Sequence, residues 1–314
     1  MNERLRFFIV LSIMALSTGC QTLPPADEST SFQRGVVSRD GEAFTFRDCF
    51  FSSSQAISDP RGELKRWFRD APQMLQQVYV ELEAQPDPEN PQNMLLRDLL
   101  LVGSHPRACE FELNGNQYRA AGEKPLWVAD IRNEGVRIQP PGRLKRLLFP
   151  PVEPRLVGDE MIWESSLSVQ GGHRMTLRLA EQACFDQYGT RYPYTATLRL
   201  NKQQYKGCAR KGDLGRRVLP ADYLYESDTQ SVRLQLKEAG EALLIEGHRE
   251  QSEFVVTHSE GRWDLLSSGR VMLEVTSEAG IKQLMFFIRN RDGSLTLNGS
   301  DTHFEKARLR FKRQ

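Results

Sequence analysis

Short segments in which apolar and polar residues alternate constrain this chain most, because a period of two is the pattern of a half-buried β-strand. The alternation is most regular over residues 218–314, where Val232 to Leu236, Val271 to Val275 and Ala307 to Phe311 all show it. Turns such as Asp292-Gly293 separate these segments. The pattern predicts seven or eight short strands that form an antiparallel meander or small barrel.

Two earlier stretches predict further β units. In residues 32–113, strand-like runs flank a segment in which Asp59-Pro60 predicts the start of a helix and Pro72 its end. In residues 114–213, Tyr192 to Leu200 and Lys202 to Cys208 predict a hairpin that turns near Asn201. The expected fold class is therefore mainly β, with three small barrel or meander units, of which the first is OB-like and carries one helix.

The N-terminus has the composition of an export signal. Arg4 and Arg6 precede an apolar run, Phe7 to Leu16, that is too short to span a bilayer as a helix, and small residues precede Cys20. This ending resembles a bacterial lipobox, in which the cysteine is acylated, for example with palmitate, and becomes the new N-terminus. We expect a lipoprotein signal peptide over 1–19, lipidation at Cys20 and a tether over 20–31; an ordinary signal peptide or a single N-terminal anchor are the alternatives.

The mature chain carries no excess charge. Removal of residues 1–19 takes away two of the 42 basic and one of the 41 acidic side chains, and so leaves equal numbers. A neutral chain has no field that attracts nucleic acid, so we expect no nucleic-acid partner. The membrane is expected as a partner only through the lipid.

Four cysteines remain once Cys20 is assigned to the lipid: Cys49, Cys109, Cys184 and Cys208. In an oxidising periplasm an even number indicates disulfides, and four cysteines allow three pairings. Pairing Cys49 with Cys109 and Cys184 with Cys208 keeps each bridge within one unit, and we predict that pairing. The spacing of a four-thiolate metal site is absent, so no metal and no cofactor are expected.

Parts of the chain resemble known envelope proteins. Phe46-Arg47-Asp48-Cys49, Val78 to Leu82 and a closing Cys109 resemble the OB-like domain of the NlpE lipoproteins, and Ser231 to Leu244 with Glu260 to Trp263 resembles their N-terminal barrel. That barrel opens with C-x-x-C in the family, whereas this chain has Ala221 to Glu226 there, so no metal or thiol-switch residues are carried over. The resemblance implies a role in envelope-stress signalling.

The central unit resembles a family of uncharacterised bacterial envelope proteins. The motifs that carry this resemblance are Glu123-Lys124-Pro125-Leu126-Trp127, Cys184-Phe185-Asp186, Tyr192 to Thr197 and Gly207-Cys208-Ala209. The family commonly has D-G-M-S after its first cysteine, and here Gln187 follows Asp186. The resemblance implies no activity.

Two groups of residues are candidates for binding. Glu123 and Trp127 could line a pocket, or Trp127 could plug a barrel end while Glu123 caps a turn. Polar and aromatic residues beside the second predicted bridge could present a binding edge, or could only pack the loop; these are Asp186, Arg191, Tyr192 and Tyr194. Phosphate loops, nucleophile elbows and H-E-x-x-H are absent from the sequence, and we predict no catalytic residues.

These observations predict a non-enzymatic, lipid-anchored protein that faces the periplasm and binds or senses an envelope protein or a small ligand. Gln21 follows the lipidated cysteine, where Asp would favour the inner membrane in enteric bacteria, so the outer membrane is the expected location. A periplasmic carrier or a buffer for a metal or small ligand is the alternative. A hydrolase with its site at a domain junction is a third.

Overall fold

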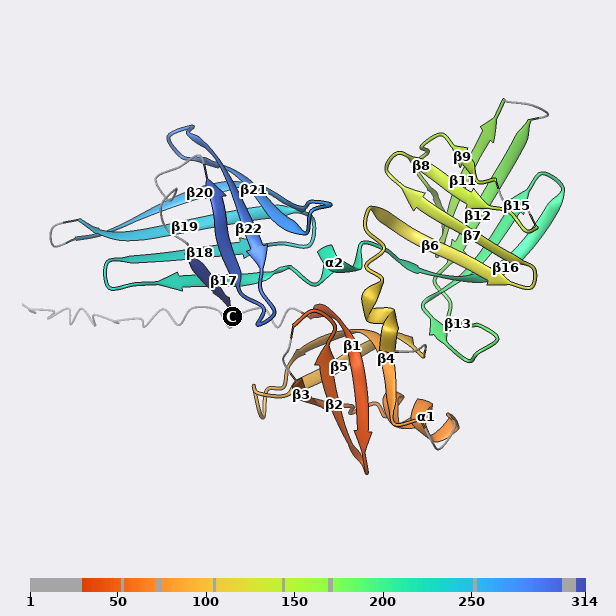
Figure 1. The fold of residues 1–314 in the computed structure, drawn as a ribbon, viewed down its shortest axis with the longest axis horizontal. Helices are drawn as coiled ribbons and strands as arrows, with labels where there is room; N and C mark the ends of the chain where they lie inside the picture. Colours follow the sequence, from red (N-terminus) through yellow and green to blue (C-terminus); the bar gives the residue numbers. More distant parts are fainter. Residues whose placement is uncertain are drawn as a thin grey trace, which may run out of the picture.

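The computed structural model describes residues 30–51, 54–71, 75–103, 106–142, 145–168, 172–250, 253–300 and 309–314. Within these ranges the chain is mainly β, as predicted, with closed barrels of five and eight strands and an open half-barrel. In Figure 1 the five-stranded barrel lies below the other two units, which stand to either side of it. The predicted signal peptide, Cys20 and nearly all of the tether lie outside the described residues.

The first unit is a closed barrel with the order β1-β2-β3-β5-β4, in which β4 also pairs with β1. The pairing of β3 with β5 is parallel and the others are antiparallel, and the helix α1 lies between β3 and β4 in the chain, which is the OB arrangement. Leu64 and Phe68 of α1 are buried in the core of this barrel. The elements are β1 Ser31–Asp40, β2 Ala43–Asp48, β3 Ser54–Ser58, α1 Glu63–Asp70, β4 Gln77–Pro86 and β5 Met94–Val102.

The helix α1 begins later than the sequence predicts. Gly62 is its N-cap residue and has φ 64°, which glycine adopts without a steric cost. The expected cap, Asp59, lies further upstream, yet its carboxylate accepts the backbone N–H of Glu63 at 2.9 Å and of Lys65 at 3.2 Å. The Asp59 side chain therefore accepts backbone N–H groups of the first helical turn from the turn that precedes the helix, and Pro60 lies in that preceding turn.

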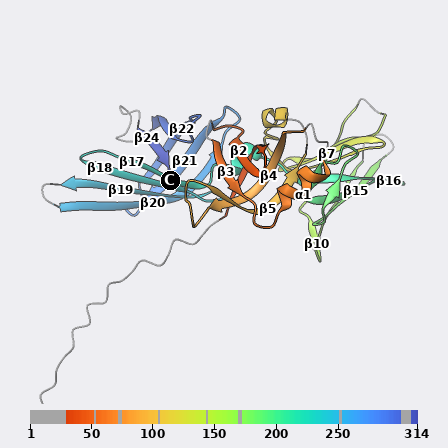
Figure 2. The same cartoon turned by 90° about the horizontal axis from the view of Figure 1, so that it is seen from below.

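The second unit is a sheet of nine strands with the order β10-β11-β12-β15-β16-β6-β7-β8-β9, and it forms the open half-barrel. The predicted hairpin is β15–β16, and it turns at Asn201, which has φ 57°. Figure 2 shows the edge strand β10 projecting from this unit. The strands are β6 Asn116–Glu123, β7 Leu126–Arg132, β8 Gly135–Gln139, β9 Leu147–Phe149, β10 Arg155–Val157, β11 Glu160–Leu167, β12 His173–Ala180, β15 Tyr194–Leu200 and β16 Gln203–Lys211.

A small hairpin of the second unit joins the first barrel instead of its own sheet. Its strands are β13 Cys184–Phe185 and β14 Arg191–Tyr192, and Arg191 pairs with Val102 of β5. The short 3₁₀ helix η1, Pro106–Glu110, follows β5, and the short helix α2, Leu214–Arg217, leads into the third unit. These connecting elements bring the three units together.

The third unit is the closed eight-stranded barrel, in which each strand pairs with the next and β17 with β24. The interior is filled by apolar side chains that include Trp263, Phe287 and Tyr223, each almost fully buried. The strands are β17 Ala221–Glu226, β18 Gln230–Leu236, β19 Glu241–Glu250, β20 Glu253–Leu265, β21 Arg270–Ser277, β22 Lys282–Arg289, β23 Leu295–Ser300 and β24 Arg310–Arg313.

Candidate functional site

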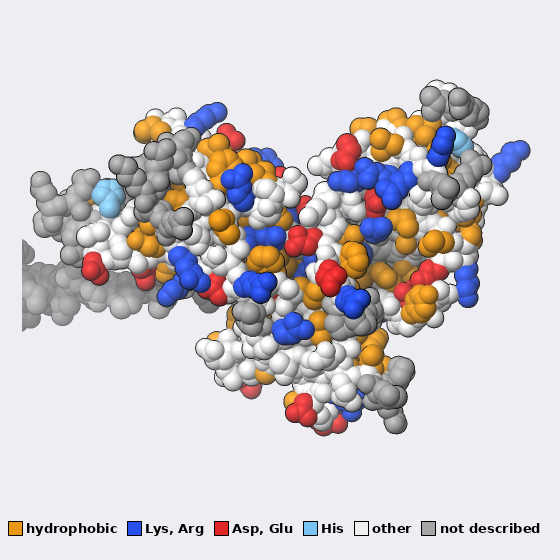
Figure 3. Space-filling model, viewed as in Figure 1, with side chains coloured by type: hydrophobic (Ala, Val, Ile, Leu, Met, Phe, Trp, Pro, Cys, Tyr) orange, Lys and Arg blue, Asp and Glu red, His pale blue; other side chains and the backbone are white. Residues whose placement is uncertain are grey.

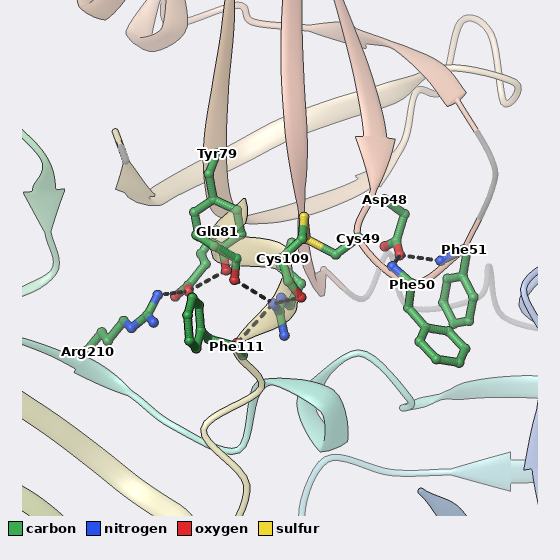
Figure 4. The surroundings of a disulfide bond; sticks show 11 residues. Asp48, Cys49, Phe50, Phe51, Tyr79, Glu81, Cys109, Phe111 and Arg210 are labelled. Carbon is green, nitrogen blue, oxygen red and sulfur yellow. Dashed lines mark hydrogen bonds and ion pairs between the residues drawn. A yellow bond between two sulfur atoms is a disulfide. The ribbon is translucent and has the colours of Figure 1, made fainter. Parts of the chain in front are cut away.

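Both predicted disulfides are present. Cys49 is bonded to Cys109, which joins the end of β2 to η1, and Cys184 is bonded to Cys208, which joins β13 to β16. The prediction of nearest-neighbour pairing is confirmed. The first bridge lies where the first barrel faces the other two units, and Figure 4 shows its surroundings.

Arg34 of β1 holds the segment around this bridge. The Nη2 atom of this buried side chain donates to the carbonyl oxygens of Ala108 at 3.2 Å, Cys109 at 2.8 Å and Phe111 at 3.1 Å. The positive charge strengthens each of these hydrogen bonds in a site with little solvent. Arg34 and the disulfide together fix η1 against the barrel.

Asp48 turns the chain toward the third unit. Its Oδ1 accepts the backbone N–H groups of Phe50 at 2.7 Å and Phe51 at 2.8 Å (Figure 4). Burial raises the pKa of the Asp48 carboxyl, and these two N–H donors offset part of that shift. The guanidinium groups of Arg289 and Arg313, both from the third unit, lie 4.3 Å and 5.5 Å from the ring centroids of Phe50 and Phe51.

A buried ion pair joins the first barrel to the second unit. Arg210 Nη1 of β16 lies 2.6 Å from Glu81 Oε1 of β4, with the two side chains only 15% and 2% exposed. The Tyr79 hydroxyl donates to the same carboxylate oxygen at 2.8 Å (Figure 4). Burial is the largest single influence on the Arg210 guanidinium and disfavours its charged form, but Glu81 together with Tyr79 and Tyr192 outweighs burial, so the pKa of Arg210 is raised overall.

The predicted cluster beside the second bridge makes contacts that hold the β13–β14 hairpin. Asp186 Oδ1 accepts the backbone N–H groups of Tyr188 at 2.9 Å and Thr190 at 2.8 Å. Arg191 donates to the carbonyl oxygens of Leu99 and Leu100 in the first barrel. Both polar side chains are thus engaged within the chain.

The two tyrosines of this cluster are partly or fully buried. Tyr194 packs edge-on against Tyr118 with 5.8 Å between ring centroids, and burial raises the pKa of Tyr194 to about 12. Burial and the neighbouring Asp186 raise the pKa of Tyr192 to about 12 as well. Both phenols remain neutral at physiological pH; Tyr194 belongs to the core of the second unit, and Tyr192 lies on the β13–β14 hairpin.

Glu123 and Trp127 both lie on the β6–β7 hairpin, but their surroundings differ. Trp127 is fully buried, and its Nε1 donates to the carbonyl oxygen of Lys206 at 3.1 Å, so it packs the core of the half-barrel. Glu123 is half-buried, and its Oε2 is buried without a hydrogen-bond partner among the described residues. Trp127 has the packing role that the sequence left as one alternative.

A cleft lies between the second and third units, and we refer to it as the inter-unit cleft. It has a volume of about 660 Å³, and its walls come from the turns before β6 and after β7, from α2 and from the paired strands β20 and β21. In Figure 3, basic and acidic side chains lie side by side where these two units meet.

Charged side chains of both signs line the inter-unit cleft. Arg216 Nε lies 3.1 Å from Asp264 Oδ1, and the same guanidinium stacks 4.5 Å from the Trp263 ring centroid. Arg262 is exposed and stands opposite Glu274 in the β20–β21 register. The cleft therefore offers hydrogen-bond donors and acceptors with no strong excess of either charge.

Asp213 lines the cleft at the start of α2, where it is the N-cap residue. Its φ of 50° is in the left-handed region, which aspartate tolerates better than most residues. Burial raises the pKa of its carboxyl, and the backbone N–H of Gly115 lowers it in part. Asp213 therefore places a carboxyl within the connection between β16 and β17.

Sequence reasoning missed this cleft. Its lining includes Asn114, Gly115 and Asp213, which lie at the two ends of the second predicted unit, and Asn133 in the β7–β8 turn. Asn, Gly and Asp favour turns for backbone reasons, so a local pattern does not distinguish a binding turn from an ordinary one. The sequence offered one indication of the cleft: turn residues lie at the ends of the second predicted unit, where neighbouring units meet.

No family model, curated protein or solved structure matches the chain. Among the described residues, no group of three or more His, Cys, Asp or Glu side chains is arranged to hold a metal ion. In the same part of the chain, no helix has both the length and the apolar character needed to cross a bilayer.

Proposed function

We propose that this chain is a lipid-anchored binding or envelope-stress sensing protein, non-enzymatic, which faces the periplasm and binds its ligand or partner in the inter-unit cleft. The observation that carries the proposal is a cleft of about 660 Å³ whose walls come from two β units that meet at the short helix α2. Ligand sites commonly lie at such boundaries between units.

The chemistry of the walls favours a polar ligand or a polar segment of a partner protein. Arg132, Arg216 and Arg262 supply donors, and Asp264 and Glu274 supply acceptors. Arg216 is already oriented by its ion pair and by the Trp263 ring, so little side-chain entropy is lost when it binds. The barrel interior of the third unit is filled by its own side chains, which favours the cleft over the barrel as the site.

The disulfides and the N-terminal stretch support the proposed location at the periplasmic face of the outer membrane. Two bridges are typical of an oxidising compartment, and Cys20 stands where a lipid would be attached. The similarity of several segments to the NlpE lipoproteins supports a role in stress signalling with an envelope protein as partner.

Photo-crosslinking in living cells tests the proposal. A photoreactive residue placed at Asn133 or Ser267, both on the cleft wall and exposed, should capture one discrete partner or ligand. The same residue at Arg199, exposed on β15 away from the cleft, is the matched control. Equal capture from the control position, or none from the two cleft positions, would reject the cleft as the site.

Fractionation tests the anchor separately. Cys20→Ala should leave an unprocessed precursor or a protein that does not partition with membranes. Normal maturation and full membrane retention of this variant would reject the lipid anchor and leave the cleft unaffected.

A further inference from the structure

A smaller pocket of about 220 Å³ adjoins the inter-unit cleft and shares Gly115, Asn133 and Asp213 with it. Its other walls come from the start of β6, the end of β16 and Arg217, which is the last residue of α2. A ligand in the cleft could therefore extend one of its groups into this side pocket.

Arg217 differs from the other arginines near the junctions. Arg210, Arg216 and Arg289 each have a carboxylate oxygen within 3.6 Å. The guanidinium of Arg217 lies 3.6 Å over the ring of Phe32, and no hydrogen bond or ion pair joins it to any residue that the structure describes. The surroundings of Arg217 thus contain an aromatic face but no paired counter-charge.

The environment of Arg217 is unfavourable for an unpaired cation. The side chain is partly buried, and burial lowers the pKa of its guanidinium even though Glu81 and Glu238 act in the opposite direction. Glu81 is occupied by Arg210 at 2.6 Å. Withdrawing a charge from water is costly unless a partner compensates, and the contact with Phe32 supplies only part of that compensation.

Among the described residues, none of the other polar groups that line the side pocket pairs with Arg217. Lys211 is exposed at the end of β16 and is a second cation in the lining. The amides of Asn116 and Gln117 are engaged, since they donate to Asp130 at 3.0 Å and to Asn133 at 2.7 Å. The one carboxylate in the lining, Asp213, accepts the Gly115 N–H and lies beside Arg216.

We propose that the side pocket binds an anionic oxygen group, a carboxylate or a phosphate, through Arg217 and Lys211, while the polar remainder of the ligand lies in the inter-unit cleft. A guanidinium presents parallel N–H donors that match two oxygens of either group, and it is already oriented by the Phe32 ring. This inference rests on the proposed function of the cleft and names the chemistry of its ligand.

Thermal unfolding of the full chain with inorganic phosphate, with succinate and with sodium chloride at matched ionic strength tests the proposal. Phosphate or succinate should raise the unfolding temperature saturably beyond the effect of chloride, and the ion with the larger effect identifies the group. Arg217→Gln should weaken that binding at least tenfold, Lys211→Gln severalfold, and Arg217→Lys less than Arg217→Gln. Arg199→Gln, an exposed arginine elsewhere on the second unit, should leave the binding unchanged.

Equal effects of all three salts, or equal binding by the parent and Arg217→Gln, would show that Arg217 only packs against Phe32 and would overturn the inference. If Arg217→Gln does not fold, Lys211→Gln decides, because Lys211 is exposed; unchanged binding in that variant has the same meaning. Crosslinking from Asn133 and Ser267 without any specific anion effect would reject this inference alone. Specific anion binding without crosslinking would reject the proposed function instead.

Discussion

Arginines meet carboxylates and aromatic rings both at the junction around the Cys49–Cys109 bridge and in the inter-unit cleft, but solvent reaches them to different extents. At the junction, Arg210 and Glu81 lie 2.6 Å apart with side chains 15% and 2% exposed. In the cleft, Arg216 and Asp264 lie 3.1 Å apart with side chains 24% and 58% exposed. A guanidinium–carboxylate pair therefore holds two units together at the buried junction, whereas in the solvent-exposed cleft the same kind of pair remains available to a ligand.

Backbone geometry supports the same distinction. Gly103 follows β5 with φ 127°, and a Cβ atom there would lie 2.7 Å from the Cα of Thr190. Only glycine allows the β13–β14 hairpin to approach the first barrel this closely. At the cleft, Gly115 and Asn133 instead line a hollow between the units. The first barrel is thus packed onto the second unit, whereas the second and third units face each other across solvent.

The largest expected change in the free energy of unfolding comes from breaking the buried ion pair of Glu81 and Arg210. Glu81→Ala should destabilise the protein by about 3–5 kcal/mol, because it leaves the Arg210 charge buried without its partner and removes the acceptor of the Tyr79 hydroxyl. Asp264→Ala in the cleft, the matched control, should cost at most about 1 kcal/mol because that carboxylate is exposed. Chemical denaturation measures both. Equal costs would mean that the junction and the cleft do not differ as described.

The second effect concerns the bridge that ties the hairpin to β16. Cys184→Ala with Cys208→Ala should cost about 3.5 kcal/mol on the loop-entropy model, since the bridge spans 24 positions in sequence. Hydrogen exchange should rise across residues 114–213 and also in β5, because β14 pairs with Val102. Exchange in 220–314 should change little. Uniform loosening of all three units would show that the cleft does not separate them energetically.

The third effect is the pH dependence of the junction. Burial and Asp186 raise the pKa of Tyr192 from 10.0 to about 12, so the folded state holds this proton more tightly than the unfolded state does. The associated stability is fully present below about pH 10 and is lost as the pH rises toward 12. Tyr192→Phe should flatten part of this loss in denaturation curves recorded over that range. Tyr188→Phe, whose parent ring is exposed, controls for removal of a hydroxyl; an unchanged slope in Tyr192→Phe would contradict the prediction.

Local patterns in the sequence predicted the β class and the hairpin at Asn201, because alternation and turn residues act over short distances. Both bridges, which span 60 and 24 positions, were predicted from the unit boundaries, since pairing neighbouring cysteines keeps each bridge within one unit. The pairing of Arg191 with Val102 was not predictable in this way, since a two-residue strand carries no period. Nor was the ion pair of Glu81 with Arg210, whose partners lie 129 positions apart. Contacts of this kind depend on how complete units dock.

The candidate site was also only partly predictable from the sequence. Asp186, Arg191, Tyr192 and Tyr194 were candidates because they are polar or aromatic and lie near a cysteine. In the structure Asp186 and Arg191 hold the β13–β14 hairpin, and Tyr194 is buried in the core of the second unit. The residues of the inter-unit cleft are turn residues and ordinary strand arginines. Their common location arises only when the second and third units meet, so the sequence order of the residues does not reveal it.

The smallest expected effect on stability is that of Arg262→Ala, which tests whether a charged residue of the cleft serves binding rather than folding. Arg262 is exposed in the cleft, stands opposite Glu274 across the β20–β21 pair and lies one residue before Trp263, which anchors the barrel core. Because its guanidinium lies in solvent, Arg262→Ala should change the free energy of unfolding by no more than about 0.5 kcal/mol. The same variant should reduce crosslinking from Asn133 or Ser267, because it removes a donor from the cleft wall. Denaturation and crosslinking of this one variant therefore distinguish a role of Arg262 in binding from a role in folding. A large loss of stability with unchanged crosslinking would show that Arg262 has a structural role, as Arg210 does.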